Sequence, residues 1–341
     1  MNIIGEHVDY NDGFVLPFAI NRGVEVRAES AERFIFESEG FKRYEMDSLE
    51  RTGDWPDYII GVIMGSAEKN IKIPPTKFTV RSNLPIGLGL SSSAALEVAA
   101  AMELKRILKV DLPPREILKI CVNAERDFVG VECGIMDQYT ALHARKGKAL
   151  LIDVVKEEHE YVDLNLKDLK FAVIDSKVKH SLNTGGYNER KREAKQALRM
   201  MGKRSYREVE EEDLEKIKNE RLRKRAEHVI GEIKRVMEAV KALRKGDVET
   251  LGRLLYESHE SLSEKYEVSC RETDFIVNFM KRMKIEGARM VGGGFGGGVL
   301  VLSRKENILK AFEKLKEEYE KTFKLKPELI FVESENGVLN S

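Results

Sequence analysis

Three features that often indicate a protein's class are missing from this sequence. Its 58 basic and 58 acidic residues cancel, so no net charge favours a nucleic-acid or anionic-membrane partner. No apolar run approaches the roughly 20 residues of a membrane-spanning helix, and the charged amino-terminal segment is unlike a signal peptide. The three cysteines, Cys121, Cys133 and Cys270, lack the paired spacing of disulfides or a zinc site, so we expect a protein of the reducing cytoplasm.

Glutamine is also scarce. Only Gln138 and Gln196 occur in 341 residues, whereas charged residues make up 34%. Thermophile proteins tend to have few labile amides and many surface ion pairs, so this composition is typical of a thermophile. A lysine-rich protein from a mesophile would look similar. The length is enough for about two domains.

Helices and strands alternate through most of the chain. Residues 187–266 are almost wholly helical in pattern, and their interspersed charges indicate a solvated surface. The charged stretch 157–170 has weak periodicity and is the expected boundary between two lobes. Apolar spacing predicts further helices at residues 55–70, 92–110, 114–130 and 306–323, and strands at residues 14–20, 23–30, 33–39, 77–83, 148–155, 170–178, 287–291, 298–303 and 328–334.

The segment "LPIGLGLSSSAALE" places a glycine pair and three serines before a helix. Gly87 and Gly89 allow sharp bends and close approach of a ligand, and Ser91–Ser93 add hydroxyls where helical N–H groups are unpaired. These features favour an anion site for nucleotide phosphates. A capped helix after a tight turn is the alternative. The spacing matches neither the Rossmann fingerprint nor the Walker loop.

The amino-terminal segment "NIIGEHVDYNDG" gathers Glu6, His7 and Asp9 between two glycines. Carboxylates and an imidazole suit a polyhydroxylated ligand, because a sugar offers many donors and acceptors. A polar turn would explain Asn11 to Gly13 but accounts less well for the three residues before them.

The segment "NAERDFVGVECGIMDQYTAL" carries Glu125 on a helix and Asp137 beyond a turn. Two such carboxylates suit a metal ligand and a proton acceptor. A helix-surface carboxylate and an N-cap, respectively, are the alternatives.

The segment "GARMVGGGFGGGVLVLS" has six glycines in the seven residues around Phe295. It predicts either ligand binding through the backbone or close approach of two elements. A flexible loop is the alternative, which the flanking strands make less favourable.

In this order the four segments resemble the galactokinases of the GHMP kinase superfamily, and "HSLNTGGYNERKREAKQAL" adds to the likeness. The first segment resembles the galactokinase signature, and "PIGLGLSSSAALE" and "GGGFGGG" resemble the second and third superfamily motifs. The resemblance implies an α+β fold with two lobes and the active site in the cleft. We expect a ribosomal-S5-like amino-terminal lobe at residues 1–165 and a ferredoxin-like lobe at 166–341.

Residue by residue, the resemblance implies a sugar pocket and a catalytic carboxylate. Asp137, within "CGIMDQ", would accept or orient the proton of the sugar C1 hydroxyl. An aspartate with an ordinary pKa near ~4 is a poor base, so either its pocket raises that pKa or it chiefly positions the hydroxyl. The sugar itself would contact Glu6, His7, Asp9, Gly134 and Tyr187.

The resemblance also implies that the protein binds ATP with Mg²⁺. Ser93 and Glu125 would hold the magnesium ion, and Ser38 would lie near the nucleotide on a looser match. The phosphates would lie on the loop formed by Gly87, Leu88, Gly89, Leu90, Ser91, Ser92 and Ser93.

The sequence departs from the family at its start. Relatives carry Gly-Arg-x-Asn where this chain begins Met1-Asn2, so we expect the true start, the phosphoryl-stabilising arginine and the first strand to lie upstream. Val291 and Gly298 stand where threonine and cysteine are more frequent, with little consequence expected.

The leading prediction is an ATP-dependent galactokinase that acts as a cytoplasmic monomer, without nucleic-acid or membrane partners. A kinase for N-acetylgalactosamine or another sugar is one alternative. A non-catalytic sensor of sugar and ATP is the other.

Overall fold

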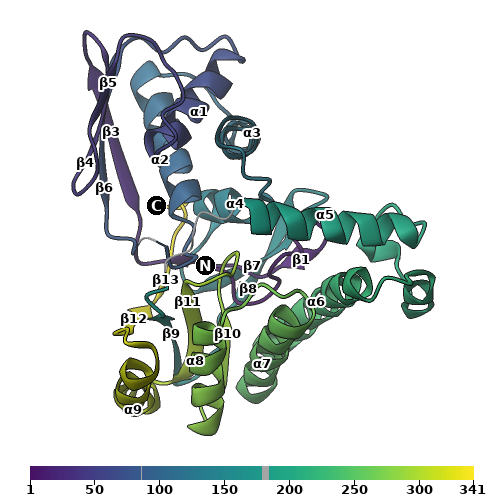
Figure 1. The fold of residues 1–341 in the computed structure, drawn as a ribbon. Coiled ribbons are helices and arrows are strands. Elements are labelled where there is room, and N and C mark those ends of the chain that lie inside the picture. The colour runs from purple at the N-terminus through teal and green to yellow at the C-terminus, as the bar shows by residue number, and fades with distance from the viewer. Residues whose placement is uncertain (86, 179–183) are drawn as a thin grey trace. The chain divides into compact units, whose positions relative to one another are not determined.

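The computed structural model describes residues 1–85, 87–178 and 184–341, and the chain forms two compact units that interleave along the sequence (Figure 1). The predicted boundary at 165/166 lies inside the first unit, and the division into consecutive lobes stays a prediction. The first unit comprises Met1–Asn21, Ile86–Leu90 and Ala144–Asn336, and the second comprises Arg22–Pro85, Ser91–His143 and Gly337–Ser341.

The second unit is built on a four-stranded sheet with the order β3-β6-β4-β5. β4 runs parallel to β6, and the other pairings are antiparallel. Phe36 and Phe78 lie opposite each other on β4 and β6 and stack at 5.4 Å between ring centroids, while α2 packs along β3. The elements are β3 (Val24–Ser30), β4 (Phe34–Ser38), β5 (Tyr44–Met46), α1 (Pro56–Ala67), β6 (Thr76–Ser82), α2 (Ser92–Leu108), α3 (Pro114–Asn123), the π-helix η1 (Ala124–Val129) and α4 (Met136–His143).

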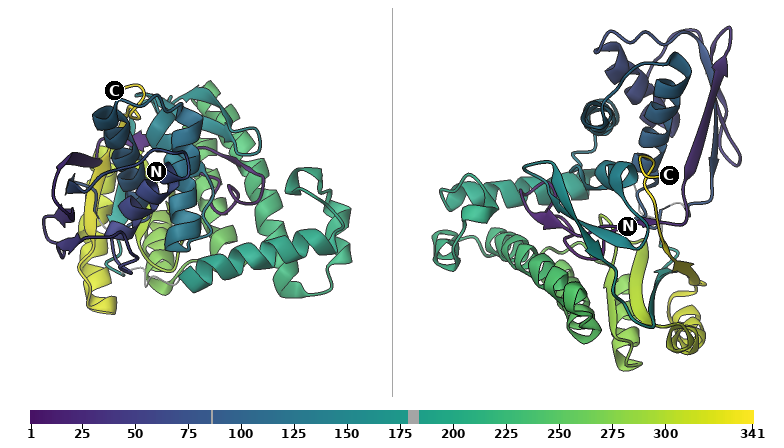
Figure 2. Two further views of the ribbon diagram at one scale, coloured as in Figure 1. Left: turned by 90° about the horizontal axis from the view of Figure 1, so that it is seen from above. Right: turned by 180° about the vertical axis from the view of Figure 1, so that it is seen from behind.

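The first unit contains an antiparallel sheet with the order β10-β11-β9-β12, against which α8 and α9 pack (Figures 1 and 2). The unit also contains the sheet β1-β7-β8, the two-stranded sheet β13-β2 and the long helices α5, α6 and α7. The elements are β1 (Phe14–Val15), β2 (Ala19–Ile20), β7 (Lys148–Asp153), β8 (Glu158–Asp163), β9 (Leu169–Asp175), α5 (Thr184–Met200), η2 (Tyr206–Glu208), η3 (Glu211–Lys216), α6 (Glu220–Lys245), α7 (Val248–Glu264), α8 (Arg271–Arg282), β10 (Gly287–Met290), β11 (Gly298–Arg304), α9 (Lys305–Phe323), β12 (Glu328–Val332) and β13 (Ser334–Glu335).

Most predicted elements are confirmed, with three local differences. The strand predicted over 14–20 is split at Pro17 into β1 and β2, which join different sheets, because proline has no N–H to donate. The helix predicted over 114–130 ends as α3 and continues as the π-helix η1. The charged stretch 157–170 contains the strand β8, which pairs with β7. Its charged residues are compatible with a strand because burial alternates along it and one side is exposed.

Within the described ranges, no helix is both long and apolar enough to cross a bilayer.

Candidate functional site

The glycine–serine loop has a backbone suited to anions. Positive φ recurs at every second residue, at Gly87, Gly89 and Ser91, and α2 begins at Ser92 as predicted. Among the described residues, the Ser91 side chain makes no capping hydrogen bond to the first turn. The helical N–H groups are therefore not satisfied by this serine, which favours the anion site over the capped turn. Ile86, also in this motif, lies outside the described residues.

The glycine-rich third motif brings backbones into direct contact. A Cβ on Gly89 would lie 2.6 Å from the Val291 carbonyl oxygen, and one on Gly292 would lie 2.6 Å from the Gly89 Cα. The prediction that two elements approach closely here is thus confirmed. At Gly298 a Cβ would lie 2.8 Å from a Val173 methyl group, so the cysteine frequent in the family would require that side chain to move.

Ser93 and Glu125, the predicted magnesium ligands, meet in a buried acidic cluster of the second unit. The Ser93 hydroxyl donates to Glu125 Oε1 at 3.1 Å. The Gln138 amide donates to Glu125 Oε2 at 2.6 Å and to Glu97 Oε2 at 2.9 Å, so one amide joins two carboxyl groups. Burial and then the nearby Glu125 raise the Glu97 pKa well above its usual value, and burial and Asp137 raise the Glu125 pKa.

This acidic cluster, Ser93, Glu97, Glu125, Asp137 and Gln138, fits a divalent cation. Glu97 Oε1 and Gln138 Oε1 are buried without a hydrogen-bond partner among the described residues. Burial and acidic neighbours, rather than lysine or arginine, act most strongly on both glutamates. Hydroxyl and carboxylate oxygens suit Mg²⁺, which keeps waters and substrate phosphates as its other ligands. No group of three His, Cys, Asp or Glu side chains placed to hold a metal ion occurs in the described residues, so magnesium binding here stays a prediction.

Sequence reasoning missed Glu97 and Gln138. Glu97 lies four residues after Ser93 on α2, so helical spacing alone places both side chains on one face. Gln138 directly follows Asp137, but only packing shows that its amide turns toward the two glutamates.

Glu6 is a buried anchor of the sugar motif in the first unit. Its Oε1 accepts hydrogen bonds from the Arg289 guanidinium and from the Gly292 N–H, both at 2.9 Å. Its Oε2 accepts one from the Asn2 amide at 3.0 Å. Arg289 is itself fully buried and donates further to backbone carbonyls, including that of Ile3 at 2.6 Å. The ion pair therefore fastens the first motif to the third.

His7 lies in a cage of tyrosine rings. Its ring centroid is 5.8, 5.3 and 4.9 Å from those of Tyr10, Tyr187 and Tyr266. Burial lowers the His7 pKa to about 3, so the imidazole is neutral. Its Nε2 is buried without a hydrogen-bond partner among the described residues, and its φ of 62° is in the left-handed region. A strained residue with an unused polar atom is a feature of ligand sites.

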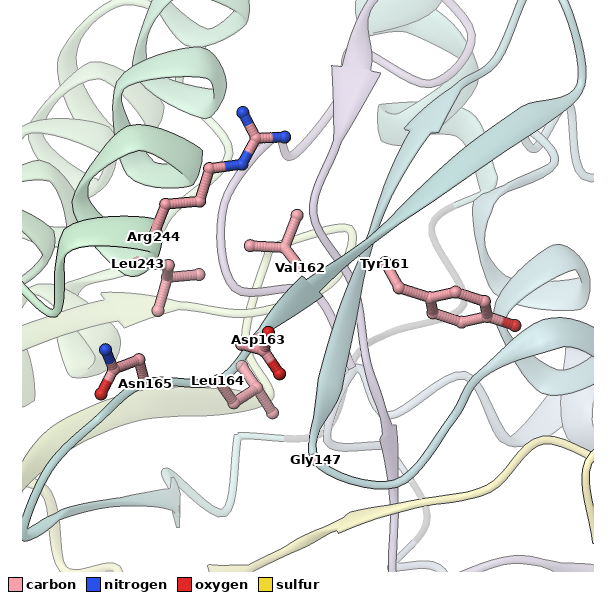
Figure 3. Close-up of a pocket in the computed structure, with 8 residues that line it drawn as sticks. All are labelled: Gly147, Tyr161, Val162, Asp163, Leu164, Asn165, Leu243 and Arg244. Atoms are coloured by element: carbon pink, nitrogen blue, oxygen red, sulfur yellow. The ribbon is translucent and has the colours of Figure 1, made fainter.

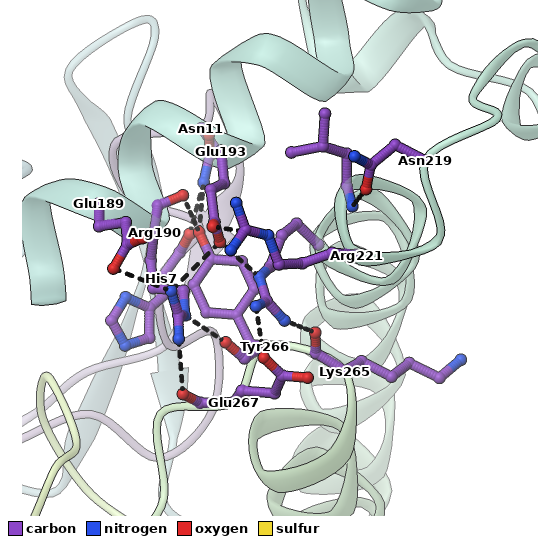
Figure 4. Close-up of polar contacts among 12 residues, drawn as sticks. His7, Asn11, Glu189, Arg190, Glu193, Asn219, Arg221, Lys265, Tyr266 and Glu267 are labelled. Carbon is purple, nitrogen blue, oxygen red and sulfur yellow. Dashed lines mark hydrogen bonds and ion pairs between the residues drawn. The ribbon is translucent and has the colours of Figure 1, made fainter.

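The helix that carries Tyr187 is held by a network of arginines. Glu193 on α5 accepts hydrogen bonds from Arg225 Nε at 2.7 Å and from Arg190 Nη1 at 3.2 Å. Arg190 Nε also donates to the Tyr266 carbonyl at 2.8 Å, as Figure 4 shows. These contacts fix α5 against α6 and the 265–267 segment, and thereby position the tyrosine cage. Residues 180–183 of the related motif lie outside the described residues.

The other predicted residues have simpler surroundings. Asp9 is half-buried and accepts a hydrogen bond from the Tyr10 N–H at 3.1 Å. Asp137 lies inside the first turn of α4 rather than at its N-cap, and the buried Gly134 precedes that helix. Ser38 ends β4, where it pairs with Val80, and its proximity to a nucleotide stays a prediction.

An open cavity of about 510 Å³ lies elsewhere on the first unit, between the β7–β8 hairpin and the end of α6 (Figure 3). None of the predicted site residues lines it. Its charged groups have surface partners, since Arg244 pairs with Glu160 and Asp163 with Lys148. We therefore locate the candidate site by its motifs rather than by this cavity.

Three family models match the chain. The GHMP kinases N terminal domain covers residues 57–145, and the GHMP kinases C terminal domain covers residues 239–321. The galactokinase galactose-binding signature covers residues 1–29, which include Glu6, His7 and Asp9.

Curated relatives match along nearly the whole chain. A galactokinase of Thermotoga neapolitana is 51% identical over 340 residues, which cover 99% of this chain and 97% of the relative. A galactokinase of Pyrococcus furiosus is 36% identical and covers 99% and 96%, respectively. The thermophile prediction from composition fits these relatives.

Two solved structures show the similarity in three dimensions. Lactococcus lactis galactokinase complexed with galactose matches with a TM-score of 0.92 at 29% identity, covering 98% of this chain and 92% of that one. Methanococcus jannaschii mevalonate kinase matches with a TM-score of 0.70 at 20% identity, covering 98% and 96%, and shares the fold alone.

Proposed function

The chain belongs to the galactokinase family of GHMP kinases, and from this premise we propose that it transfers the γ-phosphoryl group of ATP to the C1 hydroxyl of galactose. The predicted α+β GHMP kinase fold and the predicted galactokinase activity are confirmed by the relatives. The galactose-binding signature is the observation that supports the sugar assignment. It contains the neutral His7, whose Nε2 has no hydrogen-bond partner among the described residues.

The sugar is held by residues of the first motif and its neighbours. His7 and Asp9 contact sugar hydroxyl groups, and the Tyr187 ring covers one face of the ligand. Gly134 lets the chain approach the sugar closely. Both carboxylate oxygens of Glu6 already accept hydrogen bonds, from Arg289, Gly292 and Asn2. Oε2 accepts only one of these bonds, so a lone pair on this oxygen remains for a sugar hydroxyl group. The other contacts of Glu6 stabilise the loop of the first motif.

Asp137 accepts the proton of the C1 hydroxyl as that oxygen forms its bond to the γ-phosphorus. The bond between the γ-phosphorus and the β–γ bridging oxygen breaks, and ADP leaves with its electrons. Asp137 lies in the first turn of α4 and is close enough to Glu125 to raise the pKa of that carboxyl, and this position suits either a base or a positioning group. In phosphoryl transfer, positioning and charge neutralisation provide most of the rate enhancement.

The glycine–serine loop and the first turn of α2 hold the ATP phosphates through backbone N–H groups. Ser93 and Glu125 are the residues that would hold Mg²⁺, with Gln138 orienting the carboxylate. When bound, the ion neutralises charge on the phosphates. The residues present therefore fit ATP with magnesium.

Measurement of ADP release by the full chain tests this function. All three reactions contain ATP and Mg²⁺, and they differ in containing galactose, N-acetylgalactosamine or no sugar. We expect turnover with galactose well above both other arms. Preference for N-acetylgalactosamine would reassign the substrate, and binding of galactose and ATP without turnover would overturn the kinase in favour of a sensor. The predicted monomer stays a prediction, which light scattering of the same sample checks.

A further inference from the structure

Two left-handed residues shape the turn that carries the sugar motif. Gly5 has a φ of 106° and His7 a φ of 62°. The value at Gly5 is easy for glycine, whereas His7 has a Cβ and is strained in this region. A strained residue keeps such a conformation only where neighbouring groups hold it. The peptide groups on either side of His7 show which side chains do so.

Side chains hold both of these peptide groups. The Glu6 carbonyl belongs to the peptide before His7, and it accepts a hydrogen bond from His228 Nε2 at 3.2 Å. The carbonyl of His7 itself accepts one from the Asn11 amide at 2.8 Å. Rotation of the first peptide group would change φ of His7, and rotation of the second would change its ψ. The two hydrogen bonds therefore fix both backbone dihedral angles of His7.

His228 is oriented for this contact by a serine of α7. A carbonyl oxygen can only accept a hydrogen bond, so the proton of His228 is on Nε2. Burial lowers the His228 pKa to about 4, so at neutral pH Nδ1 carries no proton and accepts from the Ser261 hydroxyl at 2.9 Å. Both side chains are buried. Each ring nitrogen of His228 thus has one defined partner.

The next turn of α6 holds the same loop at a second point. Glu232, four residues after His228, accepts a hydrogen bond from the Gly5 N–H at 2.9 Å. The same oxygen accepts one from the hydroxyl of Ser258 on α7 at 2.7 Å. Residues four apart lie on one face of a helix, so His228 and Glu232 face the loop together. Helix α6 therefore holds the loop at both Gly5 and Glu6.

An apolar contact between α6 and α7 would be the simpler way to pack these helices. Burial of a histidine and a glutamate between them has a desolvation cost that leucine or valine would not have. Both side chains direct hydrogen bonds at backbone groups of the sugar motif. The cost is therefore explained if this loop has to keep one conformation.

We propose that His228 is a positioning residue, whose hydrogen bond to the Glu6 carbonyl fixes the left-handed conformation of His7 and thereby holds the His7 imidazole in place for the sugar. The proposal rests on the proposed function, in which His7 contacts the sugar. A turn that is fixed before the ligand arrives does not have to be ordered during binding. Loss of the hydrogen bond should therefore weaken the binding of galactose and leave that of ATP unchanged.

Two amide variants of His228 differ in the reach of the side chain. His228→Gln introduces a side chain long enough to place its amide nitrogen near the position of Nε2, where it can donate to the Glu6 carbonyl. His228→Asn introduces a shorter one, which reaches only the position of Nδ1, beside Ser261. Both variants replace a buried histidine by an uncharged amide with the same donors and acceptor. His228→Gln is therefore the matched control for the lost contact.

NMR of the ligand-free full chain monitors the turn directly. With ¹⁵N in histidine and ¹³C in the glutamate carbonyls, signals that join the two labels arise only from the three Glu–His steps of the sequence, Glu6–His7, Glu158–His159 and Glu227–His228. The Glu6–His7 signal is assigned by its loss in His7→Gln. It should move in His228→Asn and stay nearly in place in His228→Gln, while the Glu158–His159 signal from β8 is the internal standard. An unmoved Glu6–His7 signal in His228→Asn would overturn the proposal.

The same labelled sample provides a test that needs no folded variant with a lost contact. The ¹⁵N signals of the His228 ring, assigned by their loss in His228→Gln, report its tautomer in the unmodified protein. We expect a protonated Nε2 and a bare Nδ1. A protonated Nδ1 would mean that the hydrogen bond to the Glu6 carbonyl does not form, and this result would overturn the proposal even if His228→Asn does not fold.

Kinetics connect the turn to the sugar. In His228→Asn the galactose KM should rise about 3- to 10-fold, because one hydrogen bond that shapes the sugar site is lost, while kcat and the KM for ATP stay nearly unchanged. His228→Gln should keep all three values close to those of the unmodified chain.

Three outcomes would contradict this link. An equal rise of the galactose KM in both variants, or no rise in His228→Asn, would show that the contact with the Glu6 carbonyl does not support sugar binding. A lower kcat with an unchanged galactose KM would show a merely structural role. If the unmodified chain does not act on galactose at all, the proposed function fails, whereas the ligand-free NMR still decides whether His228 fixes His7.

Discussion

Two clusters of buried carboxylates, one in each unit, have opposite kinds of partner. In the first, Glu6 is paired with Arg289, and Glu232 with Arg235. The Glu232 pKa is lowered to about 2, since Arg235 and His228 outweigh the opposing effect of burial. In the second unit, Glu97 and Glu125 share one amide and have raised pKa values. A carboxylate paired with an arginine stabilises the fold around it. We infer that a carboxylate without a basic partner is available to bind a cation. The experiments below test this difference in order of expected effect.

Asp137→Asn should have the largest effect. The variant keeps the shape of the side chain but removes the proton acceptor, so kcat should fall by about 10²- to 10⁴-fold. Galactose-dependent ADP release measures the change, and ATP binding by calorimetry should be retained. A decrease smaller than tenfold would show that Asp137 only positions the hydroxyl.

Arg289→Met should have the second largest effect, a loss of stability of the first unit. It leaves Glu6 buried without its partner, and removing one member of a buried ion pair costs about 3–5 kcal/mol. Urea unfolding measures the loss. Arg33→Met is the control, because it breaks an exposed pair with Asp47 and should leave the urea midpoint unchanged. Equal midpoints for the two variants would contradict the compensated role of Glu6.

Glu125→Gln should give the opposite pattern. The metal-free variant should unfold at the same temperature as the unmodified protein or higher, because a buried carboxyl beside other acids is removed. The Mg²⁺ concentration for half-maximal activity should rise, on the order of 10- to 100-fold. Magnesium titration of ATP binding provides a readout that does not need turnover. Lower stability with unchanged magnesium dependence would refute the cation role.

The pH dependence of stability tests the buried, neutral histidines of the first unit. Burial lowers the pKa of His7 to about 3 and that of His228 to about 4, so below pH ~6.5 the unfolded chain takes up protons that the folded chain does not. The free energy of unfolding should therefore fall as the pH falls from ~6.5 toward 4, by up to about 1.4 kcal/mol per pH unit for each histidine. Urea unfolding at several pH values measures this slope, which His228→Gln should reduce. If His228→Gln left the pH dependence of the unfolding free energy unchanged, that dependence would not come from the lowered pKa of His228.

Local sequence features were a good guide to the elements and to the motifs. The start of α2 at Ser92, the strands beside the glycine-rich loop and the long helices after residue 187 follow from periodicity and from glycine and proline chemistry. The prediction of a lobe boundary in the charged stretch 157–170 missed β8, whose alternating burial is hidden by exposed charges. Periodicity likewise does not distinguish the π-helix η1 from a continuation of α3, because the difference is a single extra residue per turn.

The candidate site shows where sequence reasoning stops. Glu6, His7, Ser93, Glu125 and Asp137 could be named because each belongs to a short segment with family likeness. Arg289 and Glu97 lie in two of these segments and Tyr266 lies outside them, but the role of each depends on a partner from elsewhere in the chain.

By itself, the sequence determined the family, the order of the motifs and the residue types that meet sugar, phosphate and metal, because these depend on short segments with their own backbone and side-chain chemistry. Only the tertiary structure decided which charges are compensated. Arg289 reaches Glu6 across 283 positions of the chain, and Tyr10 meets Tyr266 across 256. Such partners are chosen by packing of the whole unit, and burial then sets whether a carboxylate stays charged or a histidine stays neutral.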